Sequence, residues 1–249
     1  MDLDIPLKTS EEVDGIRKSC RIAARILQAV SAHVEKGIST LELDRIAAAL
    51  MRQYDALPGV TAGFPGSTCI SVNEVAAHGV PSPHKLRKGD IITIDVAVLW
   101  HGWFGDSAAS FGVGVLSAEK QRLIETAKKA LTAAVRAARR GSRMGDVGAA
   151  VLAVAGEQQC VVLPEFVGHG IGRKLHEEPG VPHTGERGQG LPIVAGMVFT
   201  LEPVLGLGGV QVRKEADGWS LRSLDRSPVA QFEHTVAVFA NRTEVLTLP

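Results

Sequence analysis

The sequence predicts a mixed α/β domain of the α+β type, in which an antiparallel sheet is covered on one face by helices. Two observations carry this prediction. Amphipathic helical segments occur in two pairs, and β-type segments follow each pair as a group. A parallel doubly wound fold is the alternative, but it requires single strands that alternate with helices, and the chain lacks that alternation.

The first helix pair is predicted from apolar spacing and capping motifs. Thr9 to Lys36 is expected to form one helix, because apolar residues recur at spacings of three and four. Thr9 and Glu12 match a capping box, and Gly37 is expected to end this helix. A second helix is expected from Ser39 to about Gln53.

The same plan recurs further along the chain. A helix is expected from Ser117 to Arg140, ended by Gly141, which follows Gly37 by 104 positions. Another helix is expected over residues 146–159. This repeat predicts two related halves that share one sheet.

The repeat and the absence of a linker set the domain prediction. No Pro- or Ser-rich segment separates the two plans. We therefore expect a single catalytic domain over residues 1–249, with halves of about residues 1–116 and 117–249.

Composition limits the partners and the compartment. The 249 residues include 27 Lys plus Arg and 27 Asp plus Glu, so charge gives no argument for binding nucleic acid or an anionic membrane. The three cysteines form no C-x-x-C pair, which favours a reducing compartment. The polar start MDLDIPLKTSEEVDG does not match a signal peptide, and no apolar run is long enough to span a bilayer. A cytoplasmic protein without a direct nucleic-acid or membrane partner is expected.

Several side chains of the metal-ligand type stand in β-type segments or Gly-rich turns. Three of the carboxylates interrupt the apolar runs IITIDVAV, VFTLEPV and AQFEHTVAVF, where a bare charge is costly unless a cation meets it. Oxygen donors with one imidazole suit a pair of divalent metals. The sequence therefore predicts a metallohydrolase with five candidate ligands: Asp95, Asp106, His169, Glu202 and Glu233.

Of the five candidates, Asp106 and Glu233 also have explanations that require no metal. Asp95 and Asp106 flank a predicted hairpin turn at His101-Gly102, and opposed side chains in a hairpin lie ~5 Å apart at Cβ, close enough to share a metal pair. Asp106 alone is also explained as a turn residue in Gly-Asp-Ser. The polar strand face that carries Glu233 is also explained by simple solvent exposure.

Other side chains are candidates for substrate contact. His169 lies in GHGIG, where glycines allow close approach of the backbone to a ligand, and His176 follows in RKLHEEP. His78 is a candidate for substrate contact or an ordinary loop histidine. By default Cys69 reads as a small core residue, and Trp219 as a hairpin aromatic.

In this order, the segments NEVAAHGVP, IDVAVLWHGWFGDSA, GHGIGRKLHEEP, FTLEP and QFEHT resemble the methionine aminopeptidases, from Thr9 to the C-terminus. The resemblance implies the pita-bread fold with pseudo-twofold halves. It also implies removal of N-terminal methionine from nascent proteins and peptides whose second residue is small. Only 33 positions separate His169 from Glu202, which leaves no room for the helical insert of type II members, so the chain resembles type I. No N-terminal zinc-binding extension is expected, as in bacterial forms.

The resemblance also assigns roles to residues. It implies two divalent ions (Co, Mn, Fe or Zn) on the five candidate ligands, with Glu202 also catalytic. It makes His78 and His176 catalytic and substrate-contacting. A methionine pocket is implied from Phe64, Cys69 and Trp219. Thr61 stands where many bacterial members carry Tyr, so an aromatic contact at that rim is not implied. Nascent chain N-termini near the ribosome are the implied partners, and a monomer is expected.

Two alternatives remain. Prolidases and aminopeptidase P share the five ligands, but they usually carry Arg-x-Glu-Asp around the last one, where this chain has QFEHT. A catalytically silent binding protein on the same fold is the other alternative. Such proteins typically lose ligands and gain basic patches, and neither change is visible in the sequence.

Overall fold

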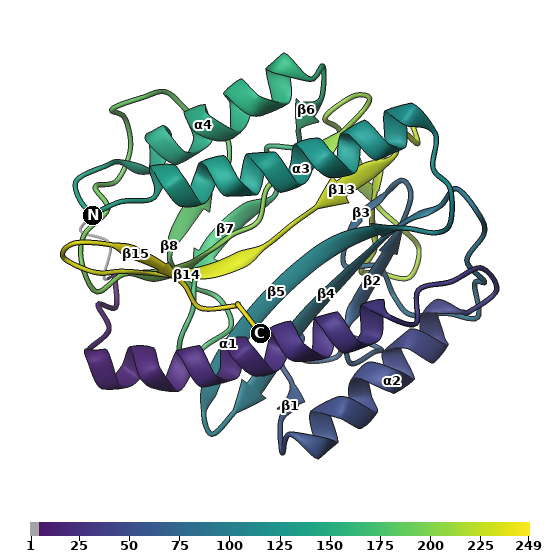
Figure 1. The fold of residues 1–249 in the computed structure, drawn as a ribbon, viewed down its shortest axis with the longest axis horizontal. Coiled ribbons are helices and arrows are strands. Elements are labelled where there is room, and N and C mark those ends of the chain that lie inside the picture. The colour runs from purple at the N-terminus through teal and green to yellow at the C-terminus, as the bar shows by residue number, and fades with distance from the viewer. Residues whose placement is uncertain (1–4) are drawn as a thin grey trace.

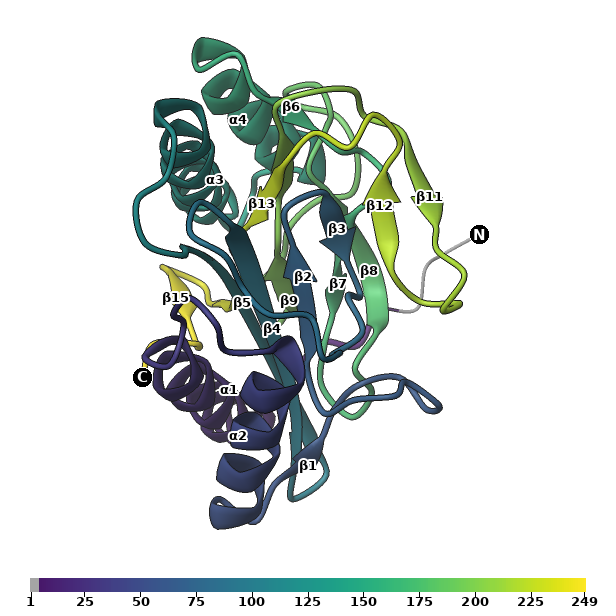
Figure 2. The same cartoon turned by 90° about the vertical axis from the view of Figure 1, so that its right-hand side faces the viewer.

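The computed structural model describes residues 5–249, which form antiparallel strands covered on one face by two helix pairs (Figures 1 and 2). The first pair is α1 (Ser10–Ser31) and α2 (Thr40–Gln53), and the second is α3 (Ala118–Ala137) and α4 (Met144–Glu157). Figure 2 shows both pairs on the same side of the strands. The predicted α+β architecture with a helix-covered antiparallel sheet is confirmed.

The strands form four hydrogen-bonded groups in which every pairing between named strands is antiparallel. The first half contributes β1 (Leu57–Pro58), β2 (Cys69–Val72), β3 (Val75–Ala77), β4 (Ile91–Trp100) and β5 (Trp103–Gly112). The second half contributes β6 (Val161–Val162), β7 (Val167–Gly170), β8 (Glu177–Pro182), β9 (Val198–Leu201), β10 (Val204–Gly206), β11 (Val212–Lys214), β12 (Leu221–Ser223), β13 (Val229–Gln231), β14 (His234–Val238) and β15 (Thr243–Val245).

Three of the helices, α1, α2 and α3, begin where the sequence predicts, but α1 and α3 end early. Thr9 closes a capping box with Glu12 at the start of α1. The predictions that Gly37 ends α1 and Gly141 ends α3 are wrong, because these helices stop at Ser31 and Ala137. Both glycines instead lie at positive φ (+98° and +89°) in the following connection. There the amide of Gly37 bonds to the Leu86 carbonyl and that of Gly141 to the Ile193 carbonyl, so contacts distant in sequence replace the last helical turn.

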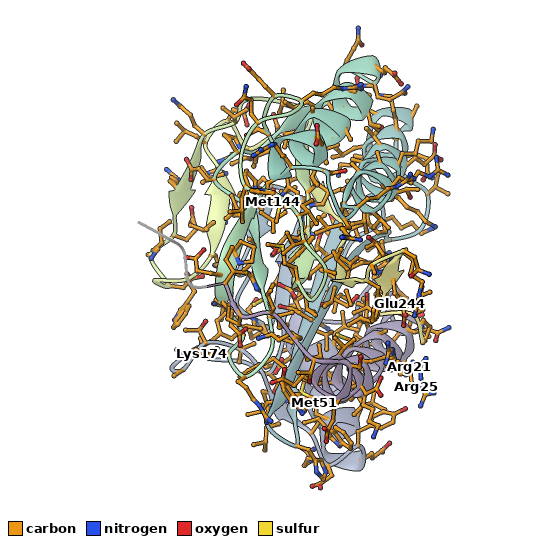
Figure 3. All side chains as sticks on the ribbon, turned by 90° about the vertical axis from the view of Figure 1, so that its left-hand side faces the viewer. Arg21, Arg25, Met51, Met144, Lys174 and Glu244 are labelled. Carbon is orange, nitrogen blue, oxygen red and sulfur yellow. The ribbon has the colours of Figure 1, made fainter. Side chains whose placement is uncertain are left out.

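Each helix pair covers its own hydrophobic core. Met51 of α2 lies in the core beneath α1 and α2, and Met144 of α4 lies in the core beneath α3 and α4 (Figure 3). The two methionines are 1% and 2% exposed. Apolar packing therefore fills the helical face of the sheet and leaves the other side for a functional site.

The β4–β5 hairpin differs in register from the expectation. The turn is His101-Gly102, as predicted, and it pairs Trp100 with Trp103. This register places Asp106 opposite Ala97 rather than opposite Asp95. The two aspartates are therefore diagonal neighbours on one face, a separation that side chains still bridge.

Within residues 5–249, no helix combines the length and the apolar character needed to cross a bilayer.

Candidate active site

A cavity of about 500 Å³ opens among strands and loops drawn from both halves of the chain. Its walls include the segment before β2, segments that follow β3, β7 and β9, and the β4–β5 hairpin. All ten candidate site residues line it: Phe64, Cys69, His78, Asp95, Asp106, His169, His176, Glu202, Trp219 and Glu233. The fold therefore gathers side chains that lie as far apart in sequence as Phe64 and Glu233.

At the floor of the cavity, acidic groups surround one imidazole. Ligand atoms of Asp106, His169 and Glu233 all lie within 4.8 Å of one another. Nε2 of His169 is 3.4 Å from Oε1 of Glu202 and 3.9 Å from Oδ2 of Asp106. Glu233 lies between β13 and β14 and is 3% exposed, which rules out the simple solvent exposure considered for its strand face.

Burial leaves these groups in unfavourable protonation states unless a cation is bound. It raises the pKa of Glu202 to about 8 and that of Asp106 to about 6, and it raises the pKa values of Asp95 and Glu233 well above the usual range. Repulsion among the neighbouring carboxylates adds to the effect at Asp95 and Glu233. Four crowded carboxyl groups therefore share a site in which the protein supplies little positive charge.

Two further observations fit this site to divalent metal. Oδ1 of Asp106 and Oε1 of Glu233 are buried acceptors without a hydrogen-bond partner among the described residues. Burial also lowers the pKa of His169 to about 4, so its imidazole is neutral at pH 7. Nδ1 of His169 lies 3.1 Å from the Gly170 carbonyl, an acceptor that requires the proton on Nδ1 and leaves the Nε2 lone pair free. Free oxygen acceptors and one free imidazole nitrogen form the donor set that a divalent cation binds.

Glu202 is held by contacts that were not predicted. Glu202 directly follows β9 and precedes Pro203. The Thr200 hydroxyl donates to Oε1 at 2.8 Å, and the Gln231 side-chain amide donates to Oε2 at 3.3 Å. Thr200 lies two positions before Glu202 in the same strand segment, and this spacing could have identified it from the sequence.

His183 completes the support of Glu202 from behind. His183 directly follows β8 and is 1% exposed. Nε2 accepts the backbone N–H of Glu202 at 3.0 Å, and Nδ1 lies 3.1 Å from the Phe166 carbonyl. Burial lowers the pKa of His183 to about 4, which keeps the ring neutral with its proton on Nδ1.

Two more histidines line the cavity. His78 follows β3 with a φ of +53°, and His176 precedes β8. The His176 ring meets the His169 ring edge-on, with centroids 4.3 Å apart. Desolvation lowers the pKa of both His78 and His176, so each is a neutral ring that can donate one N–H to a bound molecule.

An aromatic pocket adjoins the acidic floor. The rings of Phe64 and Trp219 are 5.4 Å apart at 85°, an edge-to-face pair. Cys69 pairs directly with Asp95 across β2 and β4, and its side chain reaches the cavity. Desolvation raises the thiol pKa of Cys69 well above its usual value, so it is a neutral, weakly polar part of the wall.

The fold and the site together define a metallopeptidase. The chain belongs to metallopeptidase family M24, whose model matches residues 14–240. The methionine aminopeptidase of Treponema pallidum (strain Nichols) is 39% identical over 247 residues, 98% of this chain and 97% of that protein. The methionine aminopeptidase of Escherichia coli (strain K12) is 39% identical over 248 residues, 98% of this chain and 94% of that protein.

Structural similarity agrees with the sequence matches. The crystal structure of methionine aminopeptidase from Rickettsia prowazekii matches with a TM-score of 0.95 at 34% identity, covering 98% of this chain and 100% of that one. The predicted resemblance to the methionine aminopeptidases, the pita-bread fold and the metallopeptidase class are confirmed.

Proposed function

We propose that this chain is a type I methionine aminopeptidase that removes the N-terminal methionine of peptides and nascent proteins. One observation carries the proposal: a buried cluster of uncompensated carboxylates adjoins an aromatic pocket within a single cavity. We also propose that residues 1–249 act as a single catalytic domain in two halves, working as a monomer in the cytoplasm and near the ribosome.

The metal centre is proposed to hold two divalent ions. Five residues would share them: Asp95, Asp106, His169, Glu202 and Glu233. Four carboxylates and one imidazole offer more donor atoms than one four-coordinate ion uses, which supports a pair. Oxygen and imidazole ligands suit Mn, Fe, Co or Zn, and availability then selects among them.

When bound, the ions would polarise the scissile carbonyl and lower the pKa of the attacking water. Glu202 would accept the proton of the attacking water at a carboxylate oxygen and return it to the leaving amine. Thr200 and Gln231 fix the two oxygens of Glu202 by hydrogen bonds, so the carboxylate is oriented before substrate arrives. A preorganised base of this kind avoids reorganisation during the reaction.

The two cavity histidines are proposed to contact the substrate backbone. His176 would donate its N–H to the oxygen that gains charge, a role typically worth about 2.7–4 kcal/mol for one donor. His78, which also lines the cavity, would hold the amide on the leaving side. Both rings are neutral at pH 7, which suits hydrogen bonding without an added positive charge.

Selection of methionine is assigned to the pocket of Phe64, Cys69 and Trp219. A thioether gains roughly 0.3–1.5 kcal/mol from a sulfur–aromatic contact, and the flexible side chain fits an irregular apolar wall. Crowding at the acidic floor would favour a small second residue.

The direct test uses protein stripped of metal and reloaded with each ion in turn. Met-Ala-Ser should be hydrolysed at its first bond, whereas Xaa-Pro dipeptides should not. Preference for Xaa-Pro would favour the prolidase alternative. Metal binding without turnover of either substrate, under every ion, would favour the silent binding protein. Glu125 lies on the exposed face of α3. The variant Glu125→Gln is therefore a control for acid-to-amide changes at the metal ligands, and it is expected to retain activity.

A further inference from the structure

A buried ion pair joins the segment before α1 to the residue after His176. Nζ of Lys8 lies 2.5 Å from Oε2 of Glu177, and the two side chains are only 6% and 9% exposed. The partners are 169 positions apart in sequence. Glu177 also lines the active-site cavity. Such a pair differs from surface ion pairs, whose partners stay hydrated and contribute little.

Lys8 is itself fixed on both sides. Its backbone N–H donates to the Gly196 carbonyl at 2.7 Å, and Thr9 begins α1 through its capping box. A Cβ at Gly172 would lie 2.8 Å from Nζ of Lys8. The lysine ammonium therefore occupies the space that any larger residue at Gly172 would need.

Glu177 passes this restraint to the loop of residues 171–176, which we call the histidine loop. Its second oxygen, Oε1, accepts the backbone N–H of Lys174 at 3.0 Å. Lys174 marks the loop on the side of the molecule away from Arg21 and Arg25 of α1 (Figure 3). One carboxylate thus binds the N-terminal segment through one oxygen and the histidine loop through the other.

The β4–β5 hairpin restrains the same loop from its other side. The amide of Phe104 donates to the Gly172 carbonyl at 2.9 Å, and the Arg173 guanidinium lies 3.5 Å from the centre of a Trp103 ring. The His176 ring packs edge-on against the His169 ring. The direction of the His176 side chain also depends on the backbone on either side of it. Of the two backbone neighbours of His176, Glu177 is the one held by a buried charge.

We infer that Lys8 is a positioning residue for the reaction: through its ion pair with Glu177 it sets the histidine loop so that His176 faces the substrate. The inference rests on the proposed role of His176. Lys8 does not line the active-site cavity, so its effect passes through Glu177. Its loss should therefore lower kcat, while metal content and the methionine pocket remain.

Three variants separate positioning from stability. Lys8→Met leaves Glu177 buried without its partner, so both kcat and the unfolding temperature should fall. Lys8→Met combined with Glu177→Gln removes the stranded charge, so the unfolding temperature should recover while kcat stays at least about 10-fold low, because misplacement of a group by about 1 Å can cost about 100-fold. Lys8→Arg should restore part of kcat. Recovery of full kcat in the double variant would reduce the pair to a structural role and overturn the inference.

The control is a second ion pair, formed by a residue of α1. Arg17 of α1 binds Glu244 of β15 at 2.9 Å, away from the cavity. Arg17→Met should change the unfolding temperature with little change in kcat. Metal content, measured in every variant by elemental mass spectrometry, should stay at the wild-type level. A loss of metal in Lys8→Met would place its effect at the metal centre and contradict the positioning role.

A readout independent of turnover separates this inference from the proposed function. Metal-free protein with 15N-labelled histidine should show shifted or broadened NMR signals for His176 in Lys8→Met, while those of exposed His33 stay unchanged. If wild-type protein hydrolyses no peptide, the proposed function fails, yet this signal still reports on the clamp. An unchanged His176 signal would overturn the inference whatever the activity.

Discussion

Carboxyl groups line the cavity in two electrostatic settings. At Glu177, burial acts to raise the pKa, yet the hydrogen bond and charge of Lys8 and the N–H of Lys174 bring it below its usual value. At Glu202, burial raises the pKa to about 8, and the Thr200 hydroxyl offsets that only in part. Burial and repulsion from Asp106 and Glu202 also raise the pKa of Glu233.

The difference lies in the source of the compensating charge. Burying a carboxylate is costly in both places. The chain supplies the cation for Glu177 from its own N-terminal segment, and the result is a fixed loop. For Glu202 and Glu233 it supplies no lysine or arginine partner among the described residues, and the result is a site that fits metal. A buried acid with its own partner therefore indicates structure, and one without indicates a ligand.

The largest effect is expected from removing one of the buried carboxylates that has no positive partner in the chain. Glu233→Gln should lower turnover by more than about 100-fold, since changes even to the partners of metal ligands typically cost 10–100-fold. Metal content should fall in parallel. In metal-free protein the same change should raise the unfolding free energy, because it removes an uncompensated buried carboxylate. Denaturant melts with and without metal would check the two signs, and equal destabilisation in both states would contradict the comparison.

In contrast, removing the positive partner of Glu177 should destabilise the protein. Lys8→Met should lower the unfolding free energy, because it leaves Glu177 without its partner, but by less than the about 3–5 kcal/mol typical of a fully buried ion pair. The loss should be the same with and without metal, because Lys8 does not contact the metal ligands. Urea unfolding measures both. A destabilisation that appears only in the loaded protein would show that the pair belongs to the metal centre.

The pH dependence of the unfolding free energy should also distinguish Glu202 from Glu177. Glu202 has a folded pKa of about 8 against a usual 4.5, so the folded metal-free protein holds a proton that the unfolded chain releases, and stability is lost as pH rises through that window. Glu177 has a lowered folded pKa, so its contribution is present above its usual pKa and lost as pH falls. Buried neutral histidines oppose this slope below the usual histidine pKa, because the unfolded chain protonates them there. Unfolding temperatures of chelator-treated protein should therefore fall between pH 7 and 8, where the histidines no longer contribute. Added divalent metal should remove that slope, and a persistent slope would contradict metal binding by Glu202.

The smallest effect is expected from a change that alters no charge. Gly172→Ala places a Cβ against the end of Lys8, a flexible group that can shift, so the cost should be modest. We expect kcat to fall a few-fold, in the direction of Lys8→Met, with KM and metal content unchanged. Steady-state kinetics measure the change, and Gly156→Ala is the matched control, because a Cβ there meets no atom within 4 Å. A wild-type kcat in both variants would show that the position of the Lys8 ammonium does not affect catalysis.

Much of the site was predictable because its cost is visible locally. Asp95 stands between Ile94 and Val96 in a strand, and an acid in such a run signals an external cation. The capping box at Thr9 and the two-residue turn at His101 are likewise local, so they appear in the structure where the sequence predicts them. The family resemblance added roles that local patterns leave open, such as those of His78 and His176.

The remaining features depend on contacts distant in sequence. Gly37 failed to end α1 because its amide bonds to Leu86, and no periodicity reports such a partner. Lys8 and Glu177 look like ordinary surface residues until the fold brings them together and excludes water from both. The sequence by itself determined the elements, their order and the ligand types, since these follow from short-range propensity and the cost of buried charge. The tertiary structure alone decided which charges meet, because the partner of a buried group is set by packing over distances that no local pattern encodes.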